Sequence, residues 1–428
     1  MKDHLKPFIV LLLACWLAAA APAQTPAGGA VPSQAADTLT LEAATEQFLR
    51  RNLAVEAARL EVGVAEAERV GAQLRPRPGL TLTAENLQVA GDTPFGRLYE
   101  VGVVVAQPIE LGNRRALREE VAERAVTAAG ARLTEVLQRR LFDLKRTYFE
   151  AALALALLRI EQESRDNFDE LVRLNTARFE EGDIAEGELI KVRLERIKFD
   201  SAVANAELAL RQAKVRLLEL IGETDFARAA SLEVGAKMEG RTTQLDLTAL
   251  RQAALAGRAD VRVAEAGAAL SDAVTRLERS RGKGEITPSV GYRRVGPDNT
   301  LVAGVTVPLP FGNRNQGGVA RAEAEELVAD ANVRLARNRA LAEVESAYRA
   351  YETARELVNA YEGGILRQAD ESRDITLAAY REGVANLITF LDAQRTRSEV
   401  RAGYYRALFN YHTSVFQLEL ATGTEIKP

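Results

Sequence analysis

The chain has 428 residues, of which 27% are charged and only 6% aromatic, and its formal net charge is −4 at pH 7. This mixture favours long helices over a compact core rich in aromatic side chains. Both signs of charge are interspersed along the sequence, so no basic patch points to a nucleic-acid partner.

Side chains that carry metal or nucleophilic chemistry are scarce. The sequence has one cysteine, Cys15, and two histidines, His4 and His412. Cys15 and His4 lie in the first twenty residues, so His412 is the only imidazole expected in the mature chain. These counts exclude a metal site built from His and Cys and a Cys–His nucleophile pair. We expect no cofactor and no enzyme activity, and we expect His412 to pack in a helix seam.

The N-terminus has the features of a secretory signal peptide. Two lysines precede an apolar run at residues 8–21, and Ala21-Pro22-Ala23 fits a small-residue cleavage site. We therefore expect residues 1–23 to be removed and residues 24–38 to form an N-terminal linker. The apolar run also contains a lipoprotein-like motif that ends at Cys15, so lipidation of Cys15 stays open as an alternative.

No other segment is apolar over the length of a membrane-spanning helix. The best run, Ala151 to Leu158, has eight residues, against the roughly 20 that a spanning helix needs. Any membrane-spanning role would therefore use strands, because only helices and closed barrels satisfy their backbone hydrogen bonds within lipid.

The chain repeats itself with a period of about 200 residues. The sequence Pro-Ile-Glu-Leu-Gly-Asn-Arg at 108–114 is matched by Pro-Leu-Pro-Phe-Gly-Asn-Arg at 308–314, and Phe-Glu-Glu-Gly at 179–182 by Tyr-Arg-Glu-Gly at 380–383. This period is too long for a solenoid and indicates one duplicated structural unit. The expected organisation is a first repeat, an inter-repeat equatorial segment and a second repeat, at 39–222, 223–246 and 247–424.

Each repeat begins with a helix and continues with two segments in which apolar and polar residues alternate. These segments predict β-hairpins at 79–109 and 285–309. The strands are expected to have about 9–11 residues, the length that crosses a bilayer at a tilt. Four strands cannot close a barrel alone, so either they pack in a soluble sheet or several protomers contribute four each.

A very long proline-free segment follows the strands in each repeat. From Arg114 to about Phe179 apolar residues recur at spacings of three and four, and Arg314 to Tyr380 repeats the pattern. About 65 helical residues reach about 100 Å. Gly363-Gly364 is the expected position of a bend in the second helix. With the helices that follow them, these segments form helical hairpins at 114–222 and 314–423.

The last helix carries two apolar stripes, so it can contact a neighbour on each side, as a cylindrical wall of coiled helices requires. The stripes are formed by Tyr404, Leu408, Tyr411, Val415 and Leu418, and by Tyr405, Phe409, His412 and Phe416.

This duplicated plan of two strands, a long helix, a turn and another helix resembles the TolC-like outer-membrane efflux family. The resemblance covers roughly residues 40–424. Within that family, Gln107 to Arg115 and Pro308 to Gly317 are similar to the heavy-metal cation efflux branch, the CzcC type. The resemblance implies a mainly α fold with a transmembrane β-barrel, in the bacterial outer membrane and with a large periplasmic part.

The resemblance also implies a homotrimer and its partners. Three protomers would form a 12-stranded barrel in outer-membrane lipid and a 12-helix coiled-coil tunnel in the periplasm. The turns at 179–187 and 380–387 would lie at the periplasmic tip, where the family meets a periplasmic adaptor and an inner-membrane pump, here expected to be of the RND type. The adaptor-contacting residues would be Gly182, Asp183, Gly383 and Val384. The polar path would be lined by strand residues such as Thr81, Thr83, Ser289 and Thr306.

Acidic residues just beyond the tips narrow the tunnel in this family. Asp392 fits one expected aspartate, and Glu188 occupies the place of another gating acid. Thr389 stands where the family has a further acid, so this gate departs from the pattern. Three copies of Asp392 around a pore axis would form a cation-attracting ring.

The expected function is a passive exit duct of a tripartite efflux system, exporting heavy-metal cations. A duct for drug efflux or for type I protein secretion stays open, because such partners dock on ducts of this shape. The remote alternative is a periplasmic adaptor, although adaptors have one helical hairpin rather than two. The sequence leaves the substrate, the partner pump and the resting state of the gate open.

Overall fold

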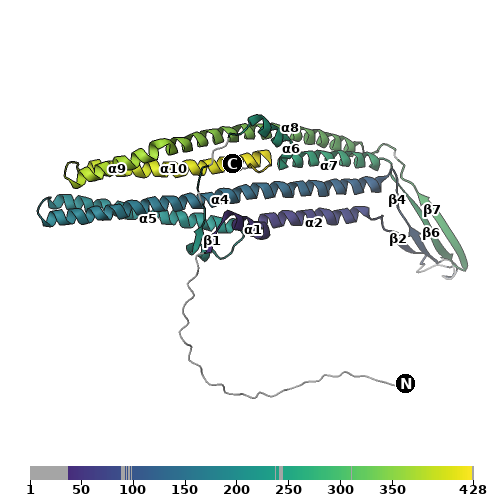
Figure 1. Ribbon diagram of the computed structural model, residues 1–428. Coiled ribbons are helices and arrows are strands. Elements are labelled where there is room, and N and C mark those ends of the chain that lie inside the picture. The colour runs from purple at the N-terminus through teal and green to yellow at the C-terminus, as the bar shows by residue number, and fades with distance from the viewer. Residues whose placement is uncertain are drawn as a thin grey trace, which may run out of the picture.

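The computed structural model describes residues 37–87, 92, 94, 97, 99–236, 238–240, 244–309 and 311–426. The expected signal peptide, Cys15 and nearly all of the expected linker therefore lie outside the described residues. The described part is a long rod of helices with a small sheet at one end (Figure 1).

Both repeats contain two helices, a β-hairpin and a long helical hairpin in the same order. The first repeat has a short strand, two helices, a β-hairpin with a short extension, and a long helical hairpin. These elements are β1 (Asp37–Leu39), α1 (Leu41–Arg51), α2 (Leu53–Gln73), β2 (Gly79–Glu85), β3 (Glu100–Ala106), β4 (Ile109–Glu110), α4 (Arg114–Glu180) and α5 (Glu186–Leu220).

The second repeat follows a 3₁₀ turn, η1 (Phe226–Ala230), and a short strand, β5 (Leu232–Val234). Its long hairpin differs from the first because a π-helical turn interrupts the ascending helix. Its elements are α6 (Leu247–Gly257), α7 (Ala259–Arg281), β6 (Glu285–Val295), β7 (Asp298–Thr306), α8 (Gln316–Ala360), the π turn η2 (Tyr361–Ile365), α9 (Leu366–Arg381) and α10 (Leu387–Thr422).

The long helices are confirmed, with one shift at the start of the second. Helix α4 runs unbroken for 67 residues, which corresponds to about 100 Å. It begins after Asn113, whose φ is +60°, in the left-handed region. The second helix was expected from Arg314 but begins at Gln316, because the left-handed residue before it is Asn315. The bend expected at Gly363-Gly364 is confirmed, since Gly364 has a φ of 145° inside the π turn.

The two apolar stripes of α10 pack against different helices, as the sequence predicts. One stripe, which includes Leu408 and Tyr411, forms a core cluster with Tyr351 and Val358 of α8. The other faces α4, where Phe416 belongs to a cluster with Tyr148. Helix α10 therefore joins the second hairpin to the first.

The middle of the rod is covered by a small parallel sheet of β1 and β5. Leu39 and Leu232 of this sheet enter the core cluster around α4, and the Tyr148 hydroxyl donates a hydrogen bond to the Leu39 carbonyl over 3.0 Å. The start of the first repeat and the segment after it thus pack together against α4. None of the described helices combines the length and the apolar content needed to cross a membrane.

The larger sheet is antiparallel, and β3 and β6 join the two hairpins. Strands β2 and β3 have 7 residues each and β6 and β7 have 11 and 9, so the first hairpin is shorter than the 9–11 residues expected. In the described residues, β2 pairs only with β3 and β7 pairs only with β6, so the two outer strands leave open edges.

The register of this sheet separates an apolar face from a polar one. Leu82, Val103, Tyr292 and Leu301 are aligned across all four strands, and their exposed fractions are 70%, 43%, 43% and 84%. The adjacent row, on the opposite face, is formed by Thr83, Gly102, Arg293 and Thr300. Thus, within the part of the chain that the structure describes, no protein core covers the large apolar side chains of the first face.

Candidate functional site

The free ends of the two helical hairpins are built in the same way and lie together at the end of the rod opposite the sheet (Figure 1). Gly182 and Gly383 have φ values of +83° and +74°, which L side chains rarely adopt. The N–H of the residue after each glycine donates back to the helix, Asp183 to Arg178 O over 2.8 Å and Val384 to Ala379 O over 2.9 Å. Each glycine thus closes a Schellman-type cap at its tip.

The two tips are tied to each other above these caps. The buried Tyr380 hydroxyl donates a 2.8 Å hydrogen bond to Asn175 Oδ1, and Arg178 Nη2 donates to Arg381 O over 2.5 Å. A local core that includes Phe168 and Phe390 lies between the hairpins here. The expected adaptor-contacting residues therefore sit on a double tip whose two hairpins contact each other, and Val384 is 80% exposed on it.

The three expected gate residues occupy different environments. Asp392 is 65% exposed and pairs with Arg395 over 2.8 Å. The backbone N–H and hydroxyl of Thr389 both donate to the N-cap side chain of Asn386, over 2.9 and 3.1 Å. Glu188 is exposed in the first turn of α5, and no ion pair to another described residue involves its side chain. Asp392 thus forms an ion pair with the Arg395 guanidinium, whereas Thr389 stabilises the start of α10.

Asp392 lines an open groove of about 470 Å³ between α4, α5 and α10. The groove also contains Glu161, Glu195 and Glu399, which the sequence analysis missed. A heptad spacing would have found two of them, because Glu195 follows Glu188 by seven residues and Glu399 follows Asp392 by seven. Burial raises the pKa of Glu161 above its usual value. The carboxylates near the expected gate therefore extend along the helices.

Two arginines of α10 join three helices through an ionic cluster. Arg397, only 4% exposed, donates to Asp370 of α9 over 2.6 Å and to Glu163 of α4 over 2.7 Å. Arg401 pairs with the same two carboxylates, over 3.0 and 2.9 Å. Burial alone would lower the pKa of Arg397, but hydrogen bonds to Glu163 and Asp370 outweigh it and raise that pKa. The cluster fixes the second hairpin against the first.

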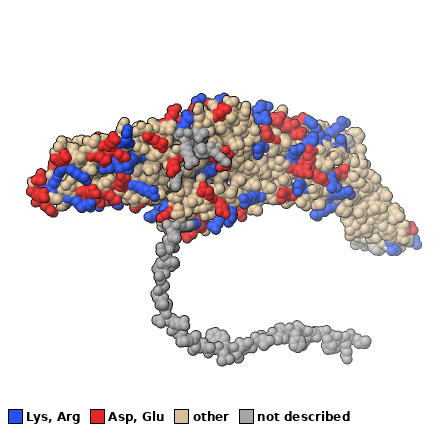
Figure 2. Space-filling model, viewed as in Figure 1, with Lys and Arg blue, Asp and Glu red and all other residues tan. Residues whose placement is uncertain are grey.

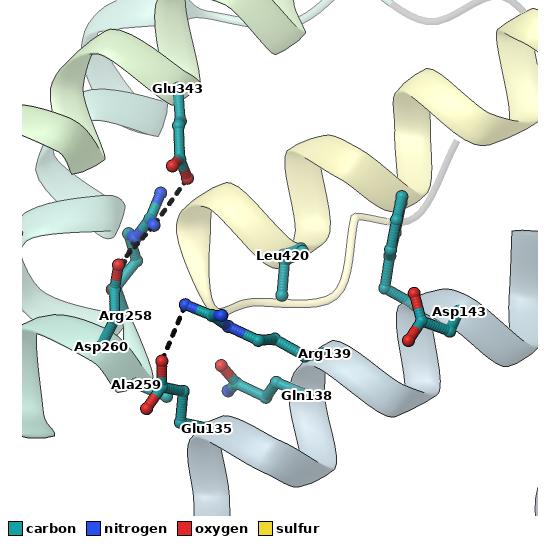
Figure 3. A pocket seen from close by; sticks show the side chains of 10 residues that line it. Glu135, Gln138, Arg139, Asp143, Arg258, Ala259, Asp260, Glu343 and Leu420 are labelled. Atoms are coloured by element: carbon teal, nitrogen blue, oxygen red, sulfur yellow. Dashed lines mark hydrogen bonds and ion pairs between the residues drawn. The ribbon is translucent and has the colours of Figure 1, made fainter. Parts of the chain in front are cut away.

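A cavity of about 360 Å³ lies where the two repeats meet (Figure 3). Arg258, 5% exposed at the junction of α6 and α7, binds Asp260 over 2.6 Å and Glu343 of α8 over 2.7 Å. Arg139 of α4 points toward them and pairs with Glu135 over 2.8 Å. Arg258 thus binds two carboxylates and Arg139 binds one within the protein, so the cavity is best explained as a packing contact between the repeats.

Charge is distributed unevenly along the molecule. Figure 2 shows both signs mixed over the helical rod and hardly any charge on the sheet before its far end.

No group of three or more His, Cys, Asp or Glu side chains within the described residues is placed to hold a metal ion. His412 packs against Phe149, with ring centroids 4.3 Å apart, and burial lowers its pKa to about 4. It is a seam residue, as expected.

Comparisons with known proteins agree on one family. The sequence profile described as outer membrane efflux protein matches residues 44–223 and 250–424. The chain is 26% identical over 386 residues to the cobalt-zinc-cadmium resistance protein CzcC of Cupriavidus metallidurans, with 88% of each chain covered. It is 30% identical over 287 residues to the nickel and cobalt resistance protein CnrC of the same organism, covering 66% of this chain and 65% of that one.

A solved structure shows the same fold. The Campylobacter jejuni CmeC outer membrane channel superposes with a TM-score of 0.76 at 15% identity, covering 90% of this chain and 85% of that one.

Proposed function

This chain belongs to the outer membrane efflux protein family, and from that membership we propose that it is the trimeric exit duct of a tripartite heavy-metal efflux system. It is an efflux channel and not an enzyme. The proposal adds three features: closure of the sheet by three copies, a gate and docking surface at the hairpin tips, and a metal-cation cargo.

The open sheet is the observation that carries the proposal. Strands β2 and β7 leave their outer edges unpaired, and an unpaired backbone group in lipid costs several kcal/mol. Pairing β2 of one copy with β7 of the next would remove both edges, and three copies would give 12 strands. The exposed apolar row that contains Leu82 and Leu301 would then face lipid, and Thr81, Thr83, Ser289 and Thr306 would line the lumen.

At the other end, we assign the gate to the acidic groove. Three copies of Asp392, with Glu188 in the first turn of α5 and Thr389 at the start of α10, would surround the axis and attract cations. In single-channel recordings, Asp392→Ala should lose block by divalent cations, whereas Glu181→Ala, at the exposed C-cap of α4 and outside the groove, should keep it. Unchanged block in Asp392→Ala would remove this residue from the gate.

The double tip would be the docking surface for the adaptor. Gly182 and Gly383 set its shape, and Asp183 and Val384 project from it. Photo-crosslinkers at Asp183 and Val384 should capture the adaptor in cells, and one at the exposed Leu60 of α2 should not. Equal capture at all three positions would argue against docking at the tip.

Metal cations are the proposed cargo because the chain aligns along most of its length with a cobalt-zinc-cadmium resistance protein. Deleting the gene should sensitise cells to divalent heavy-metal cations, and the intact gene should restore resistance. Sensitivity to drugs alone would favour a drug efflux duct, and loss of a secreted protein would favour type I secretion. If the protein purifies without detergent as a soluble monomer, that result would favour a periplasmic adaptor and contradict the proposed channel.

A further inference from the structure

The arginine cluster of the second hairpin has a counterpart in the first. Arg397 and Arg196 each follow their tip glycine by fourteen residues, and Asp370 and Asp169 each precede it by thirteen. Arg196 binds Asp169 over 2.5 Å, as Arg397 binds Asp370 over 2.6 Å. The duplication has therefore preserved this ion pair between the helices of each hairpin.

The two clusters differ in what covers them. In the second hairpin, Glu163 of α4 binds Arg397, whose side chain is only 4% exposed. In the first hairpin the ion pairs of Arg196 to described residues are with Asp169 and Asp200 of the same hairpin, and its side chain is 40% exposed. The cluster of the first hairpin is thus open on the side where the second one receives α4.

The same side of α5 carries apolar residues that are exposed in one copy. Ile190 and Leu208 are 48% and 54% exposed. Their equivalents on α10, Leu391 and Phe409, pack in core clusters between α10 and α4. A surface built like the α4-facing side of α10 therefore lies uncovered on α5.

The surface that would cover it is also present. In the packing of α10 on α4, the receiving residues of α4 include Ser164 and Leu174. Their equivalents in the second hairpin are Ile365 and Ile375, which are 41% and 71% exposed. If α5 packs on the α9 of a second copy as α10 packs on α4, each copy contacts the next head to tail, and such a contact forms a ring when its rotation closes, as the proposed trimer requires.

Within this arrangement the partner of the open cluster can be named. Arg401 corresponds to Asp200, which binds Arg196 over 2.8 Å and is 45% exposed. Glu163 corresponds to Gly364, which has no side chain, and Arg367 lies one helical turn further along α9. Arg367 is 75% exposed and its one ion pair to a described residue is a loose contact with Glu371 at 3.9 Å.

We propose that Asp200 of each copy pairs with Arg367 of the next, so that the contact between copies repeats the contact within a copy with its charges exchanged. Within a copy α10 supplies the base, Arg401, and α4 the acid, Glu163. Between copies α5 supplies the acid and α9 the base. The trimer would then carry a belt of six ionic clusters, three inside protomers and three between them. This inference rests on the proposed trimer.

Site-specific cross-linking tests the contact. Purified trimers carrying Asp200→Cys and Arg367→Cys, treated with a short bifunctional methanethiosulfonate, should give covalent dimers and trimers on denaturing gels. The control pair Glu207→Cys and Arg367→Cys retains the same face of α5 but moves the thiol about 10 Å along the helix, and should not. Equal cross-linking of both pairs, or none of the first, overturns the pairing.

Charge exchange gives an independent readout that a merely structural effect would not produce. Asp200→Arg places an arginine where the second hairpin has Arg401 and should lower the temperature at which the trimer dissociates, by about 3 °C or more. Adding Arg367→Glu should recover at least half of that drop in the dissociation temperature. If trimers form normally but the second substitution gives no rescue and the cysteine pair gives no cross-link, the pairing is disproved and the proposed duct is unaffected. A wild-type chain that forms no trimer would instead disprove the proposed duct.

Discussion

At the scale of single residues, His412 shows how burial controls protonation. Its ring packs against Phe149 and Phe416, with centroids 4.3 and 6.4 Å apart, and burial outweighs a hydrogen bond with the backbone of Glu239 to lower its pKa to about 4. The unfolded chain, with the ordinary pKa near 6.5, takes up the proton first as pH falls. Neutral His412 therefore stabilises the fold above pH 6.5, and this contribution is lost between pH 6.5 and 4.

Replacing His412 by phenylalanine should flatten the stability profile in that window. The linkage between the two pKa values corresponds to roughly 3 kcal/mol, and phenylalanine keeps the ring contacts without a titrating group. Thermal unfolding of both proteins at a series of pH values measures the difference. Parallel profiles for His412→Phe and wild type between pH 6.5 and 4 would show that the histidine does not titrate as its burial implies.

A second prediction concerns Arg397. Its side chain is 4% exposed and neutralises Glu163 and Asp370, so Arg397→Met would leave two partly buried carboxylates with only Arg401. Removing one partner of a buried ion pair typically costs about 3–5 kcal/mol. The matched control is Arg395→Met two residues away, where the side chain is 70% exposed and a loss within about 1 kcal/mol is expected. The free energy of unfolding of each variant is measured by chemical denaturation. Similar losses of stability in the two variants would contradict a stabilising role for the ionic cluster of Arg397.

At the scale of secondary-structure elements, the hairpin tips depend on the conformation of one glycine each. A Cβ added at Gly383 would meet no atom within 4 Å, yet its φ of +74° strains any other residue. Gly383→Ala should therefore destabilise the second hairpin by about 1–2 kcal/mol. Gly63→Ala, in α2, also meets open space but has ordinary helical φ, and should stabilise by up to about 1 kcal/mol. Hydrogen exchange at the tip and thermal unfolding would show whether the two changes differ in sign.

The sequence predicted these elements well where the signal is local and repeated. Gly182 and Gly383 marked the turns, and the spacing of apolar residues marked α4 and both faces of α10. The start of α8 was placed two residues early because Arg314 matches Arg114 in sequence, whereas the left-handed residue that begins the helix is Asn315. Which asparagine adopts that conformation depends on a contact far along the chain, since Asn315 Nδ2 donates to the Glu278 carbonyl over 2.9 Å.

The site was harder to predict for the same reason. Asp392 could be assigned by its position after the tip, but the groove that it lines also takes Glu161 from α4 and Glu195 from α5. These residues meet only because three helices are packed side by side. The ion pair of Arg397 with Glu163 likewise joins residues 234 positions apart. A single sequence shows the periodicity of each helix and leaves open which stripes of different helices face each other.

At the scale of the whole molecule, the proposed barrel of three copies in lipid would pair the open edges of the sheet and cover its exposed apolar face. Leu82 lies on the apolar face and is 70% exposed, and Thr83 follows it on the face expected to line the lumen. Leu82→Arg should therefore cost about 2–4 kcal/mol in a bilayer if the residue lies near its midplane, while Thr83→Arg should leave assembly largely intact. The measurement is the proportion of each variant that folds into lipid vesicles as a trimer. Folded trimer is recognised on denaturing gels by its altered mobility in unheated samples. Because the substitutions occupy neighbouring positions of one strand, a general effect on β2 would impair both equally and contradict the assigned faces. Loss of assembly in Thr83→Arg alone would indicate that the polar face of the sheet points outward. That outcome would contradict the proposed barrel, because the lipid-facing side of a membrane barrel is apolar.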